Sequence, residues 1–420
     1  MSADAPTTRT GCGGQLSRRS LLSAAGLATV VSVGSSVFPI RAALATGPVP
    51  TDTLVVLFLR GGADWLSLVS PQGDPHYAAA RPTIAVPAKN AIALDGFFGL
   101  HPNMDALKPF WDSGQLAFVH AAGSPDPSRS HFDAEYAIET GAYDKGRTYT
   151  GWLDRYLSAL PGSGSFDAVA HSNALPQSLS GPAGALAIGG IGDFDLPDWL
   201  GKDYPVALHG LYAGISHPLA RQANETLSAI ATVRAVLSGN DSDSKSSAYP
   251  GTDLGRAFAD VGQLIKANVG ARVITLDYGG WDMHQDLGYG GGGQMGNSAG
   301  ELGDAIGAFA KDMGSLLGNV TLVTITEFGR RVEENGSHGL DHGHGQAMLL
   351  LGGGTRGQKV YGRWPSLAPG ALDQGDLAAT TDIRSVFAEV LHDRMGASDA
   401  AVRQVFPHWN PVYTDAIAPR

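Results

Sequence analysis

Residues 337–346, SHGLDHGHGQ, place one aspartate and three histidines among three glycines. Imidazole and carboxylate groups are common metal ligands and are poorly suited to a hydrophobic core. Because a glycine-rich backbone favours neither helix nor strand, we expect a loop that is either a solvated turn or part of a metal site. The candidate metal ligands in this loop are Asp341, His342 and His344, and His342 is the strongest candidate of the three. His338 lies outside this compact unit and is not expected to bind the metal.

Further candidate ligands follow apolar segments elsewhere in the chain. Five segments each predict a buried strand: 52–65, 114–123, 271–284, 319–330 and 347–354. In an open α/β sheet, binding residues gather beyond the carboxyl ends of the strands. At these strand ends the candidate metal ligands are Asp64, Asp282, His284 and Glu327.

Each strand-end ligand also has a structural interpretation. Asp64 follows two glycines and could simply form a turn, and His284 could face solvent. Glu327 ends an almost continuous apolar run, so its carboxylate needs a partner, a metal ion or solvent.

Ser130 is the candidate nucleophile. It is expected at the first turn of a helix, where backbone N–H groups and the helix dipole stabilise negative charge. A neighbouring metal ion could lower the pKa of its hydroxyl. The competing interpretation is a plain helix cap, and Ser128 could take either role. Arg129 and Arg330 could bind an anionic substrate oxygen through charge-assisted hydrogen bonds.

Helices are expected between the strands, and the alternation favours an α/β sandwich around a largely parallel sheet. One helix is expected to start near Ser130 and end at Gly141. The other helical segments are 215–238, 253–269, 299–318 and 380–396. A polar segment at about 238–253 and a Gly-rich segment at about 288–300 are expected to be loops within one domain, residues 46–420.

The first 45 residues predict a twin-arginine (Tat) export signal. Arg18 and Arg19 precede an apolar run, and Ala43–Ala45 is a small-x-small cleavage site. The run contains Ser and Gly, which disfavours a permanent membrane span. We therefore expect export to a periplasm or the cell exterior, with the Tat translocase as a partner.

Charge and cysteine content narrow the function further. The chain has 29 basic and 40 acidic residues and no basic block beyond the leader, which disfavours nucleic-acid binding. Its one cysteine, Cys12, lies in the leader, so disulfides, thiolate ligands and a cysteine nucleophile are not expected. A bound metal would then be Zn, Mn, Mg or Ca, held by His, Asp, Glu, hydroxyl or water.

Several motifs in order resemble the domain of unknown function 1501 family. They are RGGADWLSLV, SRSHFDAE, GGWDMH, TEFGRR, GLDHGHGQAMLLLGGG and TTDIRSVFAEVL, and the resemblance runs from about residue 52 to 412. The family is similar to the alkaline phosphatase and sulfatase superfamily. That resemblance implies a three-layer α/β/α sandwich with a two-metal centre. Members of the domain of unknown function 1501 family typically carry Tat leaders.

The resemblance also implies residue roles. Asp64 matches a first-strand metal ligand, Ser130 the nucleophile, and Asp282 with His284 an Asp…His ligand pair at a shorter spacing. Glu327 stands where an Asp-His pair normally ends a strand, and His342 or His344 with Asp341 could supply the missing histidine.

The implied function is an exported metal-dependent hydrolase of phosphate or related esters, acting on a small or polymeric anionic ester with one or two metal ions. The alternative is a non-catalytic, metal-stabilised exported binding or surface-assembly protein. A formylglycine sulfatase is disfavoured, because proline stands at the position that such enzymes convert, in PDPSR (125–129).

Overall fold

The computed structural model describes residues 52–143, 148–160, 166–194, 204–212, 214–239 and 248–420. The predicted leader and residues 240–247 of the polar segment 238–253 lie outside these residues. No helix of the described part is long and apolar enough to cross a membrane.

Among the described residues, the main sheet has nine strands in the order β11-β5-β10-β9-β1-β8-β6-β7, with β12 beside β5. All five predicted strands form, and every pairing in this sheet is parallel except those of β10 with β5 and β9. The strands are β1 Thr53–Leu59, β5 Leu116–Gly123, β6 Ala168–His171, β7 Leu186–Ala187, β8 Val273–Tyr278, β9 Val320–Ile325, β10 Gln346–Gly352, β11 Val360–Tyr361 and β12 Thr381–Asp382. A small antiparallel sheet joins β2 Val69–Ser70, β4 Gly99–Leu100 and β3 Ile92–Ala93.

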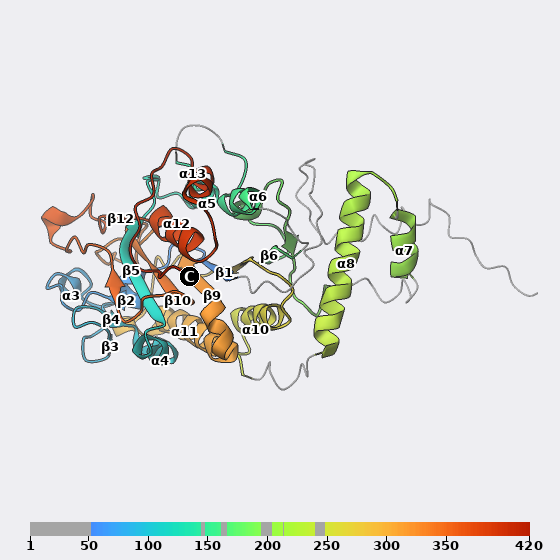
Figure 1. Ribbon diagram of the computed structural model, residues 1–420. Coiled ribbons are helices and arrows are strands. Elements are labelled where there is room, and N and C mark those ends of the chain that lie inside the picture. Colours follow the sequence, from blue (N-terminus) through green and yellow to red (C-terminus); the bar gives the residue numbers. More distant parts are fainter. Residues whose placement is uncertain (1–51, 144–147, 161–165, 195–203, 213, 240–247) are drawn as a thin grey trace, which may run out of the picture.

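Helices cover both faces of the main sheet, as Figure 1 shows. Along β1, Leu54, Val56 and Phe58 face one hydrophobic core, and the alternate residues face the other. Each fully buried leucine or valine contributes about 1.5–3 kcal/mol, and burial on both faces explains why the strands are continuous apolar runs. The predicted three-layer α/β/α sandwich is confirmed.

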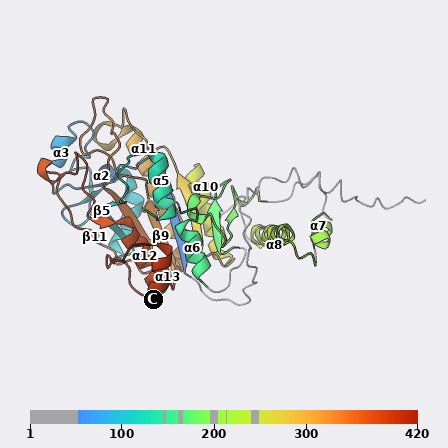
Figure 2. The same cartoon turned by 90° about the horizontal axis from the view of Figure 1, so that it is seen from above.

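The first core packs against α4 Lys108–Asp112, α10 Asp253–Lys266 and α11 Gly293–Met313, and the second against α5 His131–Thr140, α6 Trp152–Ala159, α12 Ile383–Asp393 and α13 Asp399–Val405. Beyond the β7 edge, α8 Pro218–Gly239 lies between α7 Tyr204–Tyr212 and the main body (Figures 1 and 2). The short helical segments are α2 Trp65–Leu68, α3 Tyr77–Ala80, η1 Pro102–Leu107, η2 Gln177–Leu179, η4 Tyr289–Gly291, η5 Gly314–Asn319 and η6 Pro369–Ala371.

The Gly-rich segment is not a loop throughout, and that prediction was wrong for residues 293–300. They form the first turns of α11. The glycines of this helix lie against η1, where a Cβ added at Gly303 would come within 2.8 Å of the Met104 backbone and one at Gly307 within 2.9 Å of Ala106. Glycine at helical spacing therefore serves close packing here and not chain flexibility.

Candidate metal centre

The candidate centre lies at the carboxyl edge of the main sheet. The loops after β1, β5, β8 and β9 all leave the sheet at this edge, because these strands are parallel. β10 runs antiparallel, so the loop before it, with the histidine-rich residues 337–345, arrives at the same edge. Residues from four separate segments are thereby brought together.

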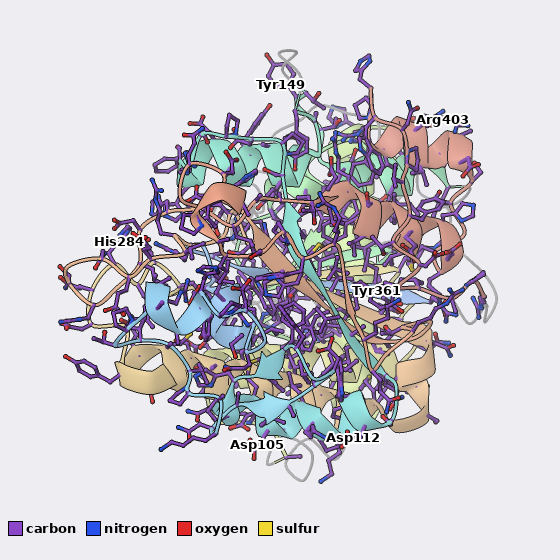
Figure 3. All side chains as sticks on the ribbon, turned by 90° about the vertical axis from the view of Figure 1, so that its left-hand side faces the viewer. Asp105, Asp112, Tyr149, His284, Tyr361 and Arg403 are labelled. Carbon is purple, nitrogen blue, oxygen red and sulfur yellow. The ribbon has the colours of Figure 1, made fainter. Side chains whose placement is uncertain are left out.

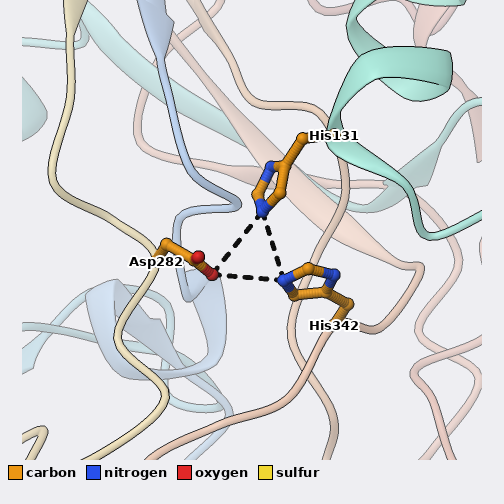
Figure 4. A group of neighbouring side chains, drawn as sticks. All are labelled: His131, Asp282 and His342. Atoms are coloured by element: carbon orange, nitrogen blue, oxygen red, sulfur yellow. Dashed lines mark hydrogen bonds and ion pairs between the residues drawn. The ribbon is translucent and has the colours of Figure 1, made fainter.

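Three side chains point toward a common centre, as Figure 4 shows: His131, Asp282 and His342. His131 Nε2 lies 3.2 Å from His342 Nε2 and 3.6 Å from Asp282 Oδ1, and His342 Nε2 lies 3.1 Å from Asp282 Oδ1. Ligands placed tetrahedrally around a zinc ion lie about 3.3–3.4 Å from one another, given metal–ligand distances of about 2.0–2.1 Å. The three atoms thus have the spacing of ligands to one ion.

His284 lies beside two members of this group. Its Nε2 lies 3.0 Å from Asp282 Oδ1 and 3.0 Å from His342 Nε2. Figure 3 shows His284 among the loops at the molecular surface, and its side chain is 43% exposed. The group is therefore open to solvent on the His284 side, as a site that admits a ligand must be.

The outer nitrogen of each imidazole is held by an acceptor. His342 Nδ1 lies 2.9 Å from the Arg129 carbonyl, His284 Nδ1 3.1 Å from Asp341, and His131 Nδ1 3.3 Å from Glu327. A carbonyl or carboxylate oxygen can only accept, so each Nδ1 donates outward and each Nε2 faces the other members of the group. An acceptor on the outer nitrogen of each ring is the arrangement typical of metal-bound histidines.

Glu327 is an orienting residue of this centre and does not join the convergent group. Its side chain is 1% exposed, and it accepts hydrogen bonds from the N–H groups of Gly61 at 2.7 Å and Gly62 at 2.8 Å. Burial would raise the pKa of Glu327, but these backbone donors and the Thr326 hydroxyl outweigh it and lower the pKa. Glu327 therefore stays ionised and fixes the His131 ring.

The two glycines are required by this contact. Both have positive φ, +110° at Gly61 and +69° at Gly62, a region that favours glycine. A Cβ at Gly61 would lie 2.7 Å from the Asp282 backbone nitrogen. The Gly-Gly pair after β1 thus lets the chain approach both Glu327 and the Asp282 loop.

The Arg330 guanidinium, expected to bind an anionic substrate oxygen, is engaged with Asp282 and with backbone carbonyls. The Arg330 side chain is 1% exposed. It donates to the carbonyls of Gly61, Gly62 and Leu340 and, at 2.6 Å, to Asp282 Oδ1. Burial raises the pKa of Asp282, but the Arg330 guanidinium more than offsets this and lowers it to about 2.

The structure does not bring Asp64 or His344 into the group. Both Asp64 oxygens accept from the buried guanidinium of Arg81, at 2.6 and 3.0 Å, so a positive partner already satisfies this carboxylate. His344 turns away, with Nε2 2.9 Å from the Ser124 carbonyl and Nδ1 3.4 Å from Asp373. The side chains of both residues are engaged with other partners in this structure.

Arg129 is likewise engaged elsewhere. Its guanidinium forms an ion pair with the buried carboxylate of Asp376, and its φ is +52°. Its backbone, not its side chain, serves the centre, through the carbonyl that holds His342. Asp341 has a similar supporting role, since it accepts from His284 and from Asn335 at 3.1 Å.

Ser130 caps α5 as predicted, directly before His131. Its Oγ accepts from the Asp133 N–H at 3.5 Å, a long hydrogen bond that leaves the hydroxyl available. His131 was not among the predicted ligands. The signal was present, because His131 follows the candidate nucleophile at the start of a helix beyond a strand end.

Residues 240–402 match the family described as Protein of unknown function (DUF1501). This confirms the family resemblance for the part of the chain that contains Asp282, His284 and His342, whereas His131 precedes it. No curated protein matches the chain in sequence.

Solved structures that match include sulfatases and alkaline phosphatases. The PsFucS1 sulfatase from Pseudoalteromonas sp. is 10% identical, with 88% of this chain and 74% of that chain covered and a TM-score of 0.37. A variant of alkaline phosphatase PafA is 12% identical, with 68% and 64% covered and a TM-score of 0.33. Alkaline phosphatase from the Antarctic bacterium TAB5 is 13% identical, with 72% and 92% covered and a TM-score of 0.28. These scores support no inference about activity.

Proposed function

We propose that this chain is a metal-dependent hydrolase of phosphate or related esters. The observation that carries the proposal is the convergence of His131 Nε2, His342 Nε2 and the Asp282 carboxylate, with His284 Nε2 beside the last two, while every Nδ1 is held by an acceptor. The proposed ligands are His131, Asp282, His284 and His342. Among the four ions considered, an imidazole-rich set favours zinc over manganese, magnesium and calcium.

A divalent cation bound here would polarise an ester oxygen and lower the pKa of a nearby hydroxyl. Residues around the proposed ligands hold them in position for a cation. Glu327 and Asp341 hold the imidazoles in one tautomer, and Arg330 keeps Asp282 ionised. Such supporting contacts keep the donor atoms in place before a ligand arrives.

Ser130 is the proposed nucleophile. It adjoins His131 in sequence and stands at the N-terminus of a ten-residue helix, where backbone N–H groups favour an anion. In the proposed step Ser130 Oγ bonds to phosphorus while the bond to the leaving alcohol breaks, and that alcohol leaves with a proton. Water then hydrolyses the phosphoserine to free phosphate and restored serine.

We further propose that the mature protein is exported. The paired arginines before an apolar run at residues 18–37 support a Tat leader, and the Tat pathway would deliver a folded, metal-loaded protein. The substrate would then be a small or polymeric anionic ester in the periplasm or outside the cell.

One observation favours the second candidate, a metal-stabilised exported binding or surface-assembly protein without turnover. Arg129 and Arg330, the cations expected to hold an anionic substrate, are both engaged within the protein. A metal centre that only stabilises the four loops that meet there would need no cationic side chain to bind a substrate.

The test uses the purified full chain with Zn, Mn, Mg or Ca and chromogenic phosphate monoesters, phosphodiesters and sulfate esters. We expect metal-dependent phosphate ester hydrolysis that His342→Ala abolishes and His344→Ala retains. These two residues lie in one loop, so the pair controls for loop damage. Bound metal without turnover on any ester would overturn the hydrolase and favour the second candidate.

A further inference from the structure

Three carboxylates beside the metal centre surround a single guanidinium. Arg60 Nη2 lies 2.6 Å from Glu139, Nε lies 3.1 Å from Asp277, and Nη1 lies 3.4 Å from Glu135. We call Glu135, Glu139 and Asp277 the carboxylate cluster. Oxygen donors gathered in this way would suit a divalent cation if the guanidinium were absent.

The carboxylate cluster adjoins the metal centre through shared contacts. Arg60 directly precedes Gly61, whose N–H donates to Glu327. Burial and the neighbouring Glu327 carboxylate raise the pKa of Glu135, which stands one turn after His131 on α5. The cluster and the His131 ligand therefore meet at one carboxylate, Glu327.

Arg60 is held firmly in the cluster. Its guanidinium lies 3.9 Å above the Phe58 ring, and its side chain is 23% exposed. Its backbone N–H donates to the Tyr278 carbonyl at 2.9 Å, so the main chain is fixed as well. Burial would lower the pKa of Arg60, but the surrounding carboxylates outweigh it and raise the pKa, so the charge is permanent.

We infer that the centre holds one metal ion per chain and that Arg60 is a second resident cation, which closes the carboxylate cluster to a second ion. This rests on the proposed metal site. It departs from the two-metal centre that the sequence resemblance implies. Within the described part of the chain, one group of donors converges, while Asp64 is paired with Arg81 and the carboxylate cluster with Arg60.

The experiment measures metal content per chain after equilibration with excess Mn²⁺ and removal of unbound ion. The chains are the wild type, Arg60→Met, Arg60→Lys and the control Arg256→Met, in which an exposed arginine paired with Asp253 is removed. We expect one ion in the wild type, in Arg60→Lys and in the control, and two in Arg60→Met, because only that variant empties the cluster of positive charge.

Electron paramagnetic resonance of the Mn²⁺-loaded wild type gives an independent readout that does not require the Arg60→Met variant to fold. An isolated ion with a six-line signal is expected, and a spin-coupled pair or two ions in the wild type would overturn the inference. One ion in folded Arg60→Met would also overturn it. No bound ion in the wild type would instead overturn the metal site itself, and thus the proposed function.

Discussion

Replacing His342 by alanine should remove most of the stability that a bound metal ion confers, whereas replacing His344 should not. His342 Nε2 lies within 3.2 Å of donor atoms from His131, Asp282 and His284. His344, two positions later, points to the Ser124 carbonyl instead. The two substitutions remove the same group from one loop, and only one of them removes a proposed ligand.

The expected size follows from metal affinity. Loss of a residue that only supports a ligand weakens metal binding about 10–100-fold, so loss of a ligand should cost at least about 100-fold. At a metal concentration of about 100 times the wild-type Kd, binding stabilises the wild type by about 2.7 kcal/mol. A variant with a Kd weakened about 100-fold gains only about 0.4 kcal/mol under the same conditions.

The assay is urea unfolding with and without Zn²⁺, with the metal-dependent gain in free energy of unfolding as the quantity compared. His344→Ala should lose about 1 kcal/mol without metal through its missing hydrogen bond, yet keep a gain of about 2.7 kcal/mol. Equal gains in the two variants would refute the assignment of His342. A gain lost in His344→Ala alone would place the ion elsewhere in the loop.

Three further outcomes are expected. Ser130→Ala should reduce ester hydrolysis to the background rate at unchanged metal content, with a loss of about 1 kcal/mol of stability from the α5 cap; full activity would remove Ser130 from the mechanism. Arg330→Met should lower the free energy of unfolding by about 3 kcal/mol or more, because buried carbonyls of Gly61, Gly62 and Leu340 lose their donor. A urea midpoint near that of the wild type would contradict this supporting role of Arg330. Burial raises the pKa of Asp154 from 3.8 to about 6. The folded state therefore binds this proton more tightly than the unfolded state, which stabilises the fold by about 3 kcal/mol below about pH 4. This contribution is lost as the pH rises through 6. Asp154→Asn should flatten that pH dependence of the urea midpoint, and an unchanged slope between pH 4 and 7 would contradict it.

Local sequence signals predict the secondary structure around the centre well. The capping serine and terminal glycine of α5 stand at Ser130 and Gly141, and Gly141 adopts the left-handed conformation. The apolar runs become strands because both faces of the sheet are covered. The one clear failure, at the start of α11, arose because glycine was taken as a loop signal where it serves close helix packing.

The amino-acid sequence by itself determined which kinds of ligand are available and that they follow strand ends. Asp282, His284 and His342 could be named from their motifs, because residue type and position after an apolar run are local properties. It also determined that no cysteine follows Cys12, which limits the metal ligands of the rest of the chain to nitrogen and oxygen donors.

Only the tertiary structure decided which candidates meet. His131 and His342 are 211 positions apart, and their contact depends on strand order and on β10 running antiparallel. Asp64 and Arg330 were equally plausible by type, but each found an internal partner of opposite charge, Arg81 and Asp282. Pairing of this kind depends on distances between side chains far apart in sequence, and these distances are set when the layers of the sandwich pack.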